Sequence, residues 1–487
     1  MMTSAIESRT GNGLALLANK CAARTFDISS GMVYASIRDQ IVRAQLLIRD
    51  LKASDSQCKR LLIVGAGVAG VSAATYASLL DIECVVLETE LSPFHLQSTV
   101  NTRFISPFMY EWPSVVSAFH NYPEIEAGLC HALDSTPSWK ADAPISASAL
   151  ARQLQEWLLH HNSVGSVPRY VFGMNADAAR AYVKQFVTQV SKLHLASATT
   201  EASPLSLPNS YTGLDGNKVV TNGASFLPDY IILAVGMGRE RVFLIDDTPD
   251  GIRGLPFWRD DDLRDSHSMN IPIGVFGGGD GALQDVLRLT TVHDHPLDFI
   301  NALEQGGDSI REEINTIRSQ LESLEQQSRL LACWSSGAVY DLIDSRCEAL
   351  CNGLVKMPKV SEKVLLQIRS GKGAVHHVFK ENRFGKAYLL NRFCVHLIYA
   401  CLQQGSQAGK VAYTRLANTE VKSAIEIDGR FDVSLSNGQT LKIERVVVRY
   451  GASQEDLKKR QLVTLSEATM TDRMSMAAIP LPYVVAQ

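Results

Sequence analysis

The sequence feature that most constrains the fold is the segment from Leu61 to Glu88, LLIVGAGVAGVSAATYASLLDIECVVLE. An apolar run predicts a buried parallel strand, and it leads into Gly65-x-Gly67-x-x-Gly70. In such a loop the first glycine permits a tight turn, the second lets the backbone approach a pyrophosphate, and the third lets helix and strand pack closely. Unsatisfied N–H groups at the start of the next helix favour an anion. A second apolar strand ends at Glu88, whose carboxylate can accept the hydroxyls of an adenosine ribose. The segment therefore predicts a dinucleotide-binding βαβ unit.

Composition limits the partners and the compartment. With 487 residues, 46% of them hydrophobic, the chain can form two or three domains. A net charge of −4 gives no basic field for a phosphate backbone, so nucleic acid is not an expected partner. No apolar run approaches the ~20 residues of a membrane span, and the first residues lack the apolar block of a signal peptide. We therefore expect no membrane association and a cytoplasmic location. Nine cysteines without regular spacing fit a reducing compartment.

An internal repeat relates residues 222–236 to residues 437–451. In each copy an Asn-Gly pair is followed by an acid seven residues after the Asn and by a glycine, Gly236 or Gly451, fourteen residues after it. Each copy reads as a hairpin turn, a short strand, an acid and an apolar strand that ends at the glycine. We expect two β-meanders, each of which returns the chain to a parallel sheet.

A second glycine-rich turn, Gly277-x-Gly279-x-x-Ala282, follows another apolar strand, and alanine is acceptable at the third position. Two features weaken it as a dinucleotide loop. Asp280 places a carboxylate at the start of the helix, where it suits the helix dipole but repels a diphosphate. The chain that follows offers no apolar strand ending in an acid; residues 308–329 and much of the sequence after them have helical spacing instead.

The first βαβ unit and the repeat together resemble the two-dinucleotide-binding-domain flavoproteins, a family of pyridine-nucleotide reductases, flavin-containing monooxygenases and N-hydroxylating monooxygenases. The resemblance implies an α/β fold: a Rossmann-like FAD-binding domain with an inserted second Rossmann-like unit, which here carries a large helical insertion. It covers about half of the chain. The matching positions are Gly65, Gly67, Gly70 and Glu88 for FAD, Gly236 at the end of the exit strand, Gly277, Gly279 and Ala282 for NADPH or NADH, and Gly451 at the end of a strand that returns to the FAD-binding domain. Arg449-Tyr450 departs from the small residues usual in that last strand.

The resemblance and the periodicity divide the chain into four expected segments. Apolar residues at helical spacing over 32–51 predict an amphipathic helix, whereas residues 1–31 show no clear period. The segments are an N-terminal extension with this helix (1–57), the first part of the FAD-binding domain (58–240), the inserted Rossmann-like and helical domain (241–405), and a return to the FAD-binding domain with a C-terminal tail (406–487).

In this family the chain after the ribose acid runs across the FAD pyrophosphate toward the flavin ring. The resemblance therefore places Arg103 where it could neutralise phosphate or flavin charge, with Gln97 and Asn101 as hydrogen-bonding groups. Tyr110 and Glu111 are the candidate catalytic residues, and Glu111 is the candidate acid or base. The alternative interpretation is an aromatic-anchored loop that packs on the FAD domain.

Other reactive side chains lack a diagnostic pattern. No Cys-x-x-Cys occurs, and Cys347 and Cys351 are expected to line a core. The histidines of residues 293–295 and 376–377 have no companion ligands at diagnostic spacing, so no metal site is expected. Residues 380–392 carry cations at helical spacing that could receive an anionic ligand, although a solvated helix face is the favoured explanation.

Three interpretations of the second glycine turn stay open. It binds a nicotinamide nucleotide, it is a degenerate relic within an oxidase, or it binds another adenosine-containing ligand. The GGGDG turn also resembles the nucleotide loop of spermidine-synthase-like aminopropyl transferases, which the FAD-type unit upstream disfavours.

The sequence favours an FAD-dependent oxidoreductase for a small organic substrate, NAD(P)H-linked as a monooxygenase or reductase. An enzyme that resembles amine or amino-acid oxidases is the alternative if the second turn is degenerate. A different class of protein is a non-catalytic flavin- or nucleotide-binding sensor or assembly protein. In that protein the helical insertion, residues 283–404, would bind a protein partner or a second copy of the chain.

Overall fold

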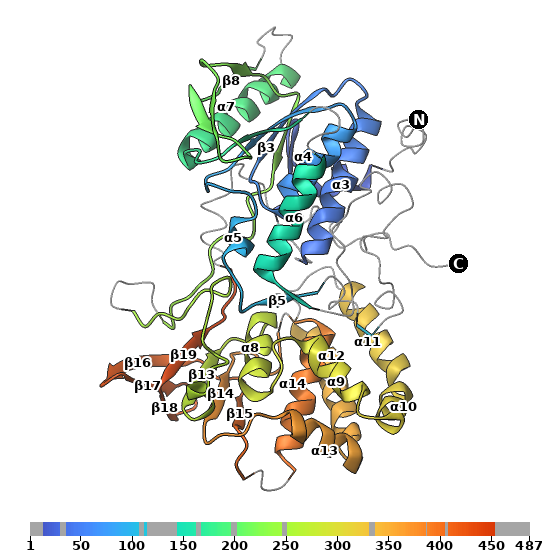
Figure 1. The fold of residues 1–487 in the computed structure, drawn as a ribbon, viewed down its shortest axis with the longest axis vertical. Coiled ribbons are helices and arrows are strands. Elements are labelled where there is room, and N and C mark those ends of the chain that lie inside the picture. The colour runs from blue at the N-terminus through green and yellow to red at the C-terminus, as the bar shows by residue number, and fades with distance from the viewer. Residues whose placement is uncertain are drawn as a thin grey trace.

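The computed structural model describes residues 13–29, 36–106, 112–113, 144–161, 167–195, 202–245, 251–330, 337–385, 387–404 and 408–452. These residues form two α/β units, which follow one another along the longest axis of the molecule (Figure 1). Each unit is built on its own parallel sheet. Within the described residues no helix combines the length and the apolar character needed to cross a membrane.

The first sheet has six strands in the order β1-β2-β12-β3-β4-β7, and every pairing is parallel except that of β1 with β2. Alternate residues of its central strand face opposite sides: Leu61 and Ile63 lie in one hydrophobic core, and Leu62 and Val64 lie in another. The strands are β1 (Lys20–Ala22), β2 (Thr25–Asp27), β3 (Arg60–Val64), β4 (Glu83–Leu87), β7 (Arg169–Val171) and β12 (Tyr230–Leu233).

Helices cover both faces of this sheet. The helices α3 (Ile37–Ser54), α4 (Val68–Leu79) and α6 (Ala147–His161) pack together on one face, and α7 (Ala176–Leu195) covers the other (Figure 1). The predicted amphipathic helix of residues 32–51 is therefore present as α3. Smaller elements connect these layers: α2 (Leu14–Asn19), α5 (His95–Ser98), and the pairs β5 (Phe104–Ile105) with β6 (Ile145–Ser146), β9 (Ser210–Thr212) with β10 (Lys218–Val220), and β8 (Leu205–Ser206) with β11 (Ser225–Phe226).

The second sheet has four strands in the order β15-β14-β13-β19, and all of its pairings are parallel. This is the order of β7-β4-β3-β12 in the first sheet: third, second and first strand, and then the strand that follows an antiparallel connection. In the first unit that connection is not the expected meander, because β10 pairs with β9 and β11 pairs with β8. The elements are β13 (Pro272–Phe276), α8 (Asp280–Thr290), β14 (Ala374–Val378), α14 (Leu389–Leu402), β15 (Ala412–Leu416), the meander β16 (Val421–Ile427), β17 (Arg430–Leu435) and β18 (Thr440–Ile443), and β19 (Arg445–Val448). A short 3-10 helix, η3 (His267–Met269), precedes β13.

The expected helical insertion lies between α8 and β14. Five helices separate these two neighbouring elements of the second unit, and they pack beside α14 (Figure 1). The strand β14 that follows them joins the sheet beside β13, so the second unit keeps its Rossmann-like order despite the insertion. The inserted helices are α9 (Pro296–Glu304), α10 (Asp308–Thr316), α11 (Arg318–Leu330), α12 (Gly337–Leu354) and α13 (Pro358–Gln367).

The expected return to the FAD-binding domain is wrong for the described part of residues 406–487. The strand β19 pairs with β13 in the second sheet, so each copy of the internal repeat returns the chain to its own sheet. The place beside β12 that a return strand could take is filled by β2, and the Ile28 N–H also donates to the Leu233 carbonyl at 2.8 Å. Part of the N-terminal extension, residues 1–57, therefore belongs to the first sheet.

Candidate functional site

The three glycines of the first loop have different surroundings. A Cβ atom on Gly65 would overlap the Ala234 carbonyl oxygen, and one on Gly70 would overlap the Gly65 carbonyl oxygen. Gly65 also has φ of 109°, which an L side chain rarely adopts. By contrast, Gly67 has φ of −74°, and a Cβ atom there would meet nothing within 4 Å. The first and third glycines are required by packing, whereas nothing in the packing of the protein requires a glycine at position 67, which is where the dinucleotide fingerprint has the glycine that faces the pyrophosphate.

The helix α4 begins at this open space without a cap. Gly67 is its N-cap residue, no side chain accepts a hydrogen bond from its first N–H groups, and its first turn carries no acid. The partial positive charge of a helix N-terminus is therefore not neutralised by a side chain of the helix itself. A diphosphate placed there would receive backbone hydrogen bonds and a favourable dipole.

The Glu88 carboxylate lies beside the same loop. Its Oε2 atom accepts the Ala66 N–H at 2.6 Å, and its Oε1 atom accepts the N–H groups of Thr89 and Glu90 at 2.7 and 3.0 Å. These bonds fix the carboxylate at the carboxyl end of β4, and the Oε2 atom keeps the capacity to accept a ribose hydroxyl. Gly236, exposed with φ of 76°, follows β12, which pairs with β3. The first loop, the acid and the exit strand thus meet at one edge of the sheet, where α/β proteins bind ligands.

The second glycine loop has the same backbone shape as the first. Gly277 has φ of 132°, and a Cβ atom there would overlap the Arg449 carbonyl oxygen, as Gly65 would overlap that of Ala234. Gly279 is the N-cap residue of α8, and Ala282 is fully buried. The two loops are therefore equivalent, and their surroundings can be compared position by position.

The second unit has no acid at the position of Glu88. Leu87 and Val378 are equivalent, because each pairs with the residue just before its glycine loop. The next residue is Glu88 in the first unit and Phe379 in the second. Phe379 is 4% exposed, and its ring lies 4.9 Å from that of His377. The position directly after the strand therefore carries no carboxylate, and the next acid is Glu381, two residues farther along the chain.

Acidic side chains lie next to the second loop. The Asp280 Oδ1 atom accepts the Tyr388 N–H at 2.8 Å and the Asn391 Nδ2 group at 2.6 Å, so this carboxylate caps the start of α14. The Glu381 Oε2 atom lies 3.6 Å from the place of a Cβ atom on Gly278. Negative charge therefore lies on the side of the loop where a diphosphate would bind.

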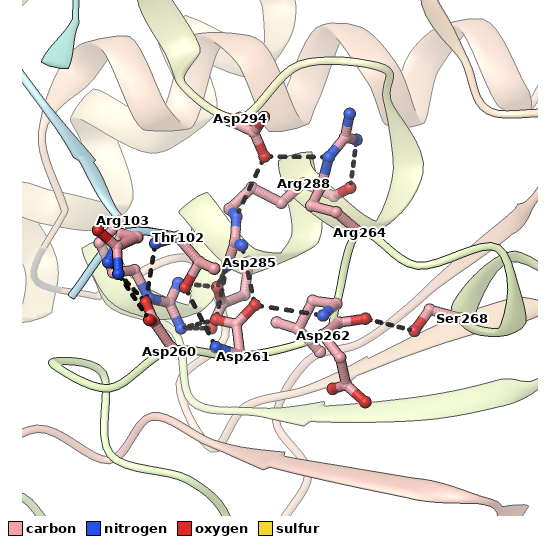
Figure 2. Close-up of polar contacts among 12 residues, drawn as sticks. Thr102, Arg103, Asp260, Asp261, Asp262, Arg264, Ser268, Asp285, Arg288 and Asp294 are labelled. Atoms are coloured by element: carbon pink, nitrogen blue, oxygen red, sulfur yellow. Dashed lines mark hydrogen bonds and ion pairs between the residues drawn. The ribbon is translucent and has the colours of Figure 1, made fainter. Parts of the chain in front are cut away.

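A buried ionic cluster lies where the two units meet (Figure 2). It comprises Asp285 and Arg288 of α8, Arg449 after β19, Arg103 of the first unit, and Asp261 of the segment before β13. Arg288 Nη2 lies 2.8 Å from Asp261 Oδ1, and Arg449 Nε lies 2.7 Å from Asp285 Oδ2. Neighbouring ion pairs extend the cluster to Asp294 and Arg264.

Burial alone would raise the pKa of the Asp285 carboxyl. The charges of Arg103, Arg449 and Arg288 outweigh burial and hold that pKa well below its usual range. Asp285 therefore carries its negative charge at neutral pH. The five members of the cluster carry three positive and two negative charges.

Arg103 has a different role from the expected one. Its guanidinium pairs with Asp285, lies 2.7 Å from Asp261, donates to the Phe257 carbonyl at 2.9 Å, and stacks 4.3 Å from the Phe257 ring centroid. The side chain is 2% exposed and so has almost no surface for a cofactor. The expectation that it neutralises FAD is wrong, because buried aspartates of the second unit and of the preceding segment already bind it. Asn101 likewise donates to Asp260 at 3.0 Å.

The candidate catalytic residues Tyr110 and Glu111 lie outside the described residues. The next residue, Trp112, is 6% exposed, and its ring lies 5.0 Å from that of Phe393 in α14. This end of the segment therefore packs on the second unit. The alternative interpretation expected it to pack on the FAD-binding domain, which is the first unit.

The cysteine prediction is confirmed, since Cys347 and Cys351 are fully buried in the core of the second unit. Burial also raises the pKa of Cys351 well above its usual value. The two histidine segments serve the fold: His295 Nδ1 accepts the Leu297 N–H at 3.1 Å, and His377 Nε2 lies 2.6 Å from the Gly277 carbonyl oxygen.

The expectation of a cationic helix face over residues 380–392 is wrong. Of the described residues in this range, those from Leu389 onward are helical, in α14, and those before it are not. Arg392 is fully buried, with its Nη1 atom 2.6 Å from Asp344 Oδ1, and Arg383 pairs with Glu348 at 2.5 Å.

The sequence matches no family model and no curated protein. Three solved structures are similar in fold. The bacillithiol disulfide reductase Bdr from Staphylococcus aureus is 10% identical, with 83% of this chain and 80% of that chain covered and a TM-score of 0.37. The reduced form of ornithine hydroxylase from Pseudomonas aeruginosa is 14% identical (81% and 82% covered, TM-score 0.32), and T. acidophilum thioredoxin reductase is 10% identical (86% and 98% covered, TM-score 0.33). At this level of similarity the strand order of the two sheets carries the fold assignment.

Proposed function

We propose that the first unit binds FAD and that the protein is an FAD-dependent oxidoreductase acting on a small organic molecule. The observation that carries the proposal is the open space at Gly67, before the uncapped helix α4 and beside the Glu88 carboxylate. This arrangement fits an adenine dinucleotide. The resemblance to the two-domain flavoproteins selects FAD among the dinucleotides. When bound, FAD supplies two-electron redox chemistry that no amino-acid side chain offers.

Each part of the site has a separate task in this proposal. The first N–H groups of α4 would bind the pyrophosphate, and Glu88 would orient the adenosine ribose. Large apolar side chains are exposed where the chain leaves the carboxyl ends of β4 and β12: Leu91 at 73%, Leu96 at 53% and Met237 at 46%. Such exposed apolar side chains fit a ligand with planar rings.

The source of electrons separates the two enzymatic alternatives. A monooxygenase or reductase would take hydride from NAD(P)H at the second glycine loop, whereas an oxidase-like enzyme would take it from the substrate. A sensor that binds FAD without turnover is the alternative from a different class. The helical insertion α9–α13 is the surface we propose for a protein partner in that case.

The decisive test compares Gly67→Leu with Gly353→Leu. Neither leucine Cβ would meet a neighbour within 4 Å, and neither glycine has a positive φ, so both variants should fold with wild-type stability. Purified wild-type protein and Gly353→Leu should show or regain the visible absorption of bound FAD, and Gly67→Leu should not. Equal FAD binding by Gly67→Leu would contradict the assignment of this loop. A wild-type protein that cannot be loaded with FAD would contradict the function itself.

A further inference from the structure

We infer that the second glycine loop is not a nicotinamide nucleotide site, because Arg449 of the ionic cluster that joins the two units lies against the first turn of the helix that follows it. Although the strand order and the loop backbone repeat those of the first unit, the residues that face the loop do not fit a dinucleotide. Three differences between the equivalent loops support this inference, one from packing and two from charge.

The first difference is the residue after the last strand. Ala234 and Arg449 are equivalent, since each carbonyl oxygen touches the first glycine of its own loop. Ala234 projects only a methyl group, but the Arg449 side chain crosses the first turn of α8. Its Cδ atom, like the nearest ring carbon of Phe257, lies 3.3 Å from the place of a Cβ atom on Gly281. The flank of the helix N-terminus is therefore occupied by protein in the second unit.

Arg449 is held in this place by several partners. Its Nε atom lies 2.7 Å from Asp285 Oδ2, and its Nη1 atom donates to the Leu255 carbonyl at 2.6 Å. Its guanidinium carbon lies 5.6 Å from the Phe257 ring centroid, and Arg103 stacks on the same ring. A dinucleotide could enter only if it displaced a side chain that is 9% exposed and paired with a buried carboxylate. That displacement would leave Asp285 with one partner fewer.

The second difference is the charge at the loop itself. Asp280 stands at the first helical position, where the first unit has Val68, and Glu381 approaches Gly278. The three nearby arginines offer no compensation, because each is already paired with Asp261 or Asp285. A diphosphate at this helix would meet the carboxylates of Asp280 and Glu381, and it could bind one of these guanidinium groups only by breaking an existing ion pair.

The third difference is the ribose position, where Phe379 replaces an acid. The ribose diol of NADH therefore has no acceptor directly after the strand, and the nearest carboxylate along the chain, that of Glu381, lies against the loop at Gly278. The neighbouring Lys380 side chain is 68% exposed, and its Nζ atom lies 4.0 Å from Glu381 Oε1. This carboxylate partly offsets the positive charge that would attract the 2′-phosphate of NADPH.

The consequence for catalysis rests on the proposed function. With no nicotinamide site, the organic substrate itself is the reductant: it loses a hydride and a proton. Dioxygen takes up the same two electrons and two protons and becomes hydrogen peroxide. This places the protein with the oxidase-like alternative.

The test is calorimetric titration of the full-length protein with NADH and with NADPH, repeated on Gly67→Leu and Gly279→Leu. We expect no saturable binding of either nucleotide to the wild-type protein or to the two variants, up to millimolar concentrations. We also expect neither nucleotide to bleach the flavin of the wild-type protein under anaerobic conditions. Saturable binding that persists in Gly67→Leu but is lost in Gly279→Leu would overturn the inference. Binding lost only in Gly67→Leu would place the nicotinamide nucleotide in the first loop, which supports the inference and contradicts FAD binding there. Urea unfolding of each variant shows whether a loss of binding reflects a loss of fold.

Discussion

The ionic cluster makes Asp285 the most informative position for a stability measurement. Its carboxylate is fully buried and pairs with Arg103, with Arg449 at 2.7 Å and with Arg288 at 3.2 Å. In Asp285→Asn the side chain keeps its shape, but Arg449 loses its carboxylate partner, and Arg103 and Arg288 keep Asp261. Removing one partner of a buried ion pair costs about 3–5 kcal/mol. We expect the free energy of unfolding to fall by that amount, and the two units to unfold in separate transitions once their joint is weakened.

Asp262→Asn is the matched control, because it makes the same change in the neighbouring segment. The Asp262 side chain is 53% exposed and pairs with Arg445 at 2.6 Å, and an exposed pair contributes about 0–1 kcal/mol. Urea unfolding followed by tryptophan fluorescence and circular dichroism measures both variants without adding salt. Equal effects of the two substitutions would refute our account of the cluster as a buried joint.

Three other predictions test separate parts of the structure. Burial lowers the pKa of His295 to about 3, whereas the pKa of a histidine in the unfolded chain is ~6.5. The contribution of the neutral, buried His295 to stability is therefore complete above pH ~6.5 and is lost as the pH falls below that value. The asparagine of His295→Asn keeps an acceptor for the Leu297 N–H. In this variant the free energy of unfolding should fall less steeply between pH 6 and pH 4, by up to ~1.4 kcal/mol per pH unit. If urea titrations give the same pH dependence for the variant and the wild type, the burial argument is contradicted. Deletion of residues 1–29 should expose the edge of β12, which should lower the melting temperature and cause aggregation, seen as concentration-dependent light scattering. A melting curve like that of the wild type would show that β2 does not stabilise the sheet. Glu88→Gln should weaken FAD binding by roughly 10–100-fold, since a hydrogen bond to a charged group contributes ~1.5–3 kcal/mol; unchanged affinity would remove Glu88 from the site.

Local pattern was sufficient to predict both strand–loop–helix segments and the second meander. The first expected meander is wrong, because β10 pairs with β9 and β11 pairs with β8, and the two strands on either side of Asn222 do not pair with each other. Glycine spacing, apolar runs and turn residues act over a few residues, and the structure has β3 with α4, β13 with α8, and strands before Gly236 and Gly451 where those patterns lie. The partner of β19 could not be predicted in this way. The sequence of a strand as short as the four residues of β19 does not indicate which sheet the strand joins. The place beside β12 is taken by β2, a three-residue strand about 200 residues before β12 in the chain.

Arg103 shows the same limit for the site. The sequence shows a cation near the expected cofactor but not the distance to a competing carboxylate 182 positions away. A signal was available in the three consecutive aspartates 260–262, which bind Asn101, Arg103 and Arg445. The equivalence of Phe379 to Glu88 could not be predicted for another reason. The helical insertion places β14 so far along the chain from α8 that the residue at the ribose position could not be found by counting residues from the glycine loop.

The position of β2 beside β12 also constrains how the protein is made. Residues 25–27 leave the ribosome long before residues 230–233, the only strand of the parallel series with which they pair. At ~5–20 residues per second, the intervening ~200 residues take about 10–40 seconds to synthesise. During that time Phe26 and Ile28, both buried in the finished protein, have no sheet to join. The nascent chain therefore presents an apolar strand that chaperones can bind until β12 has been translated.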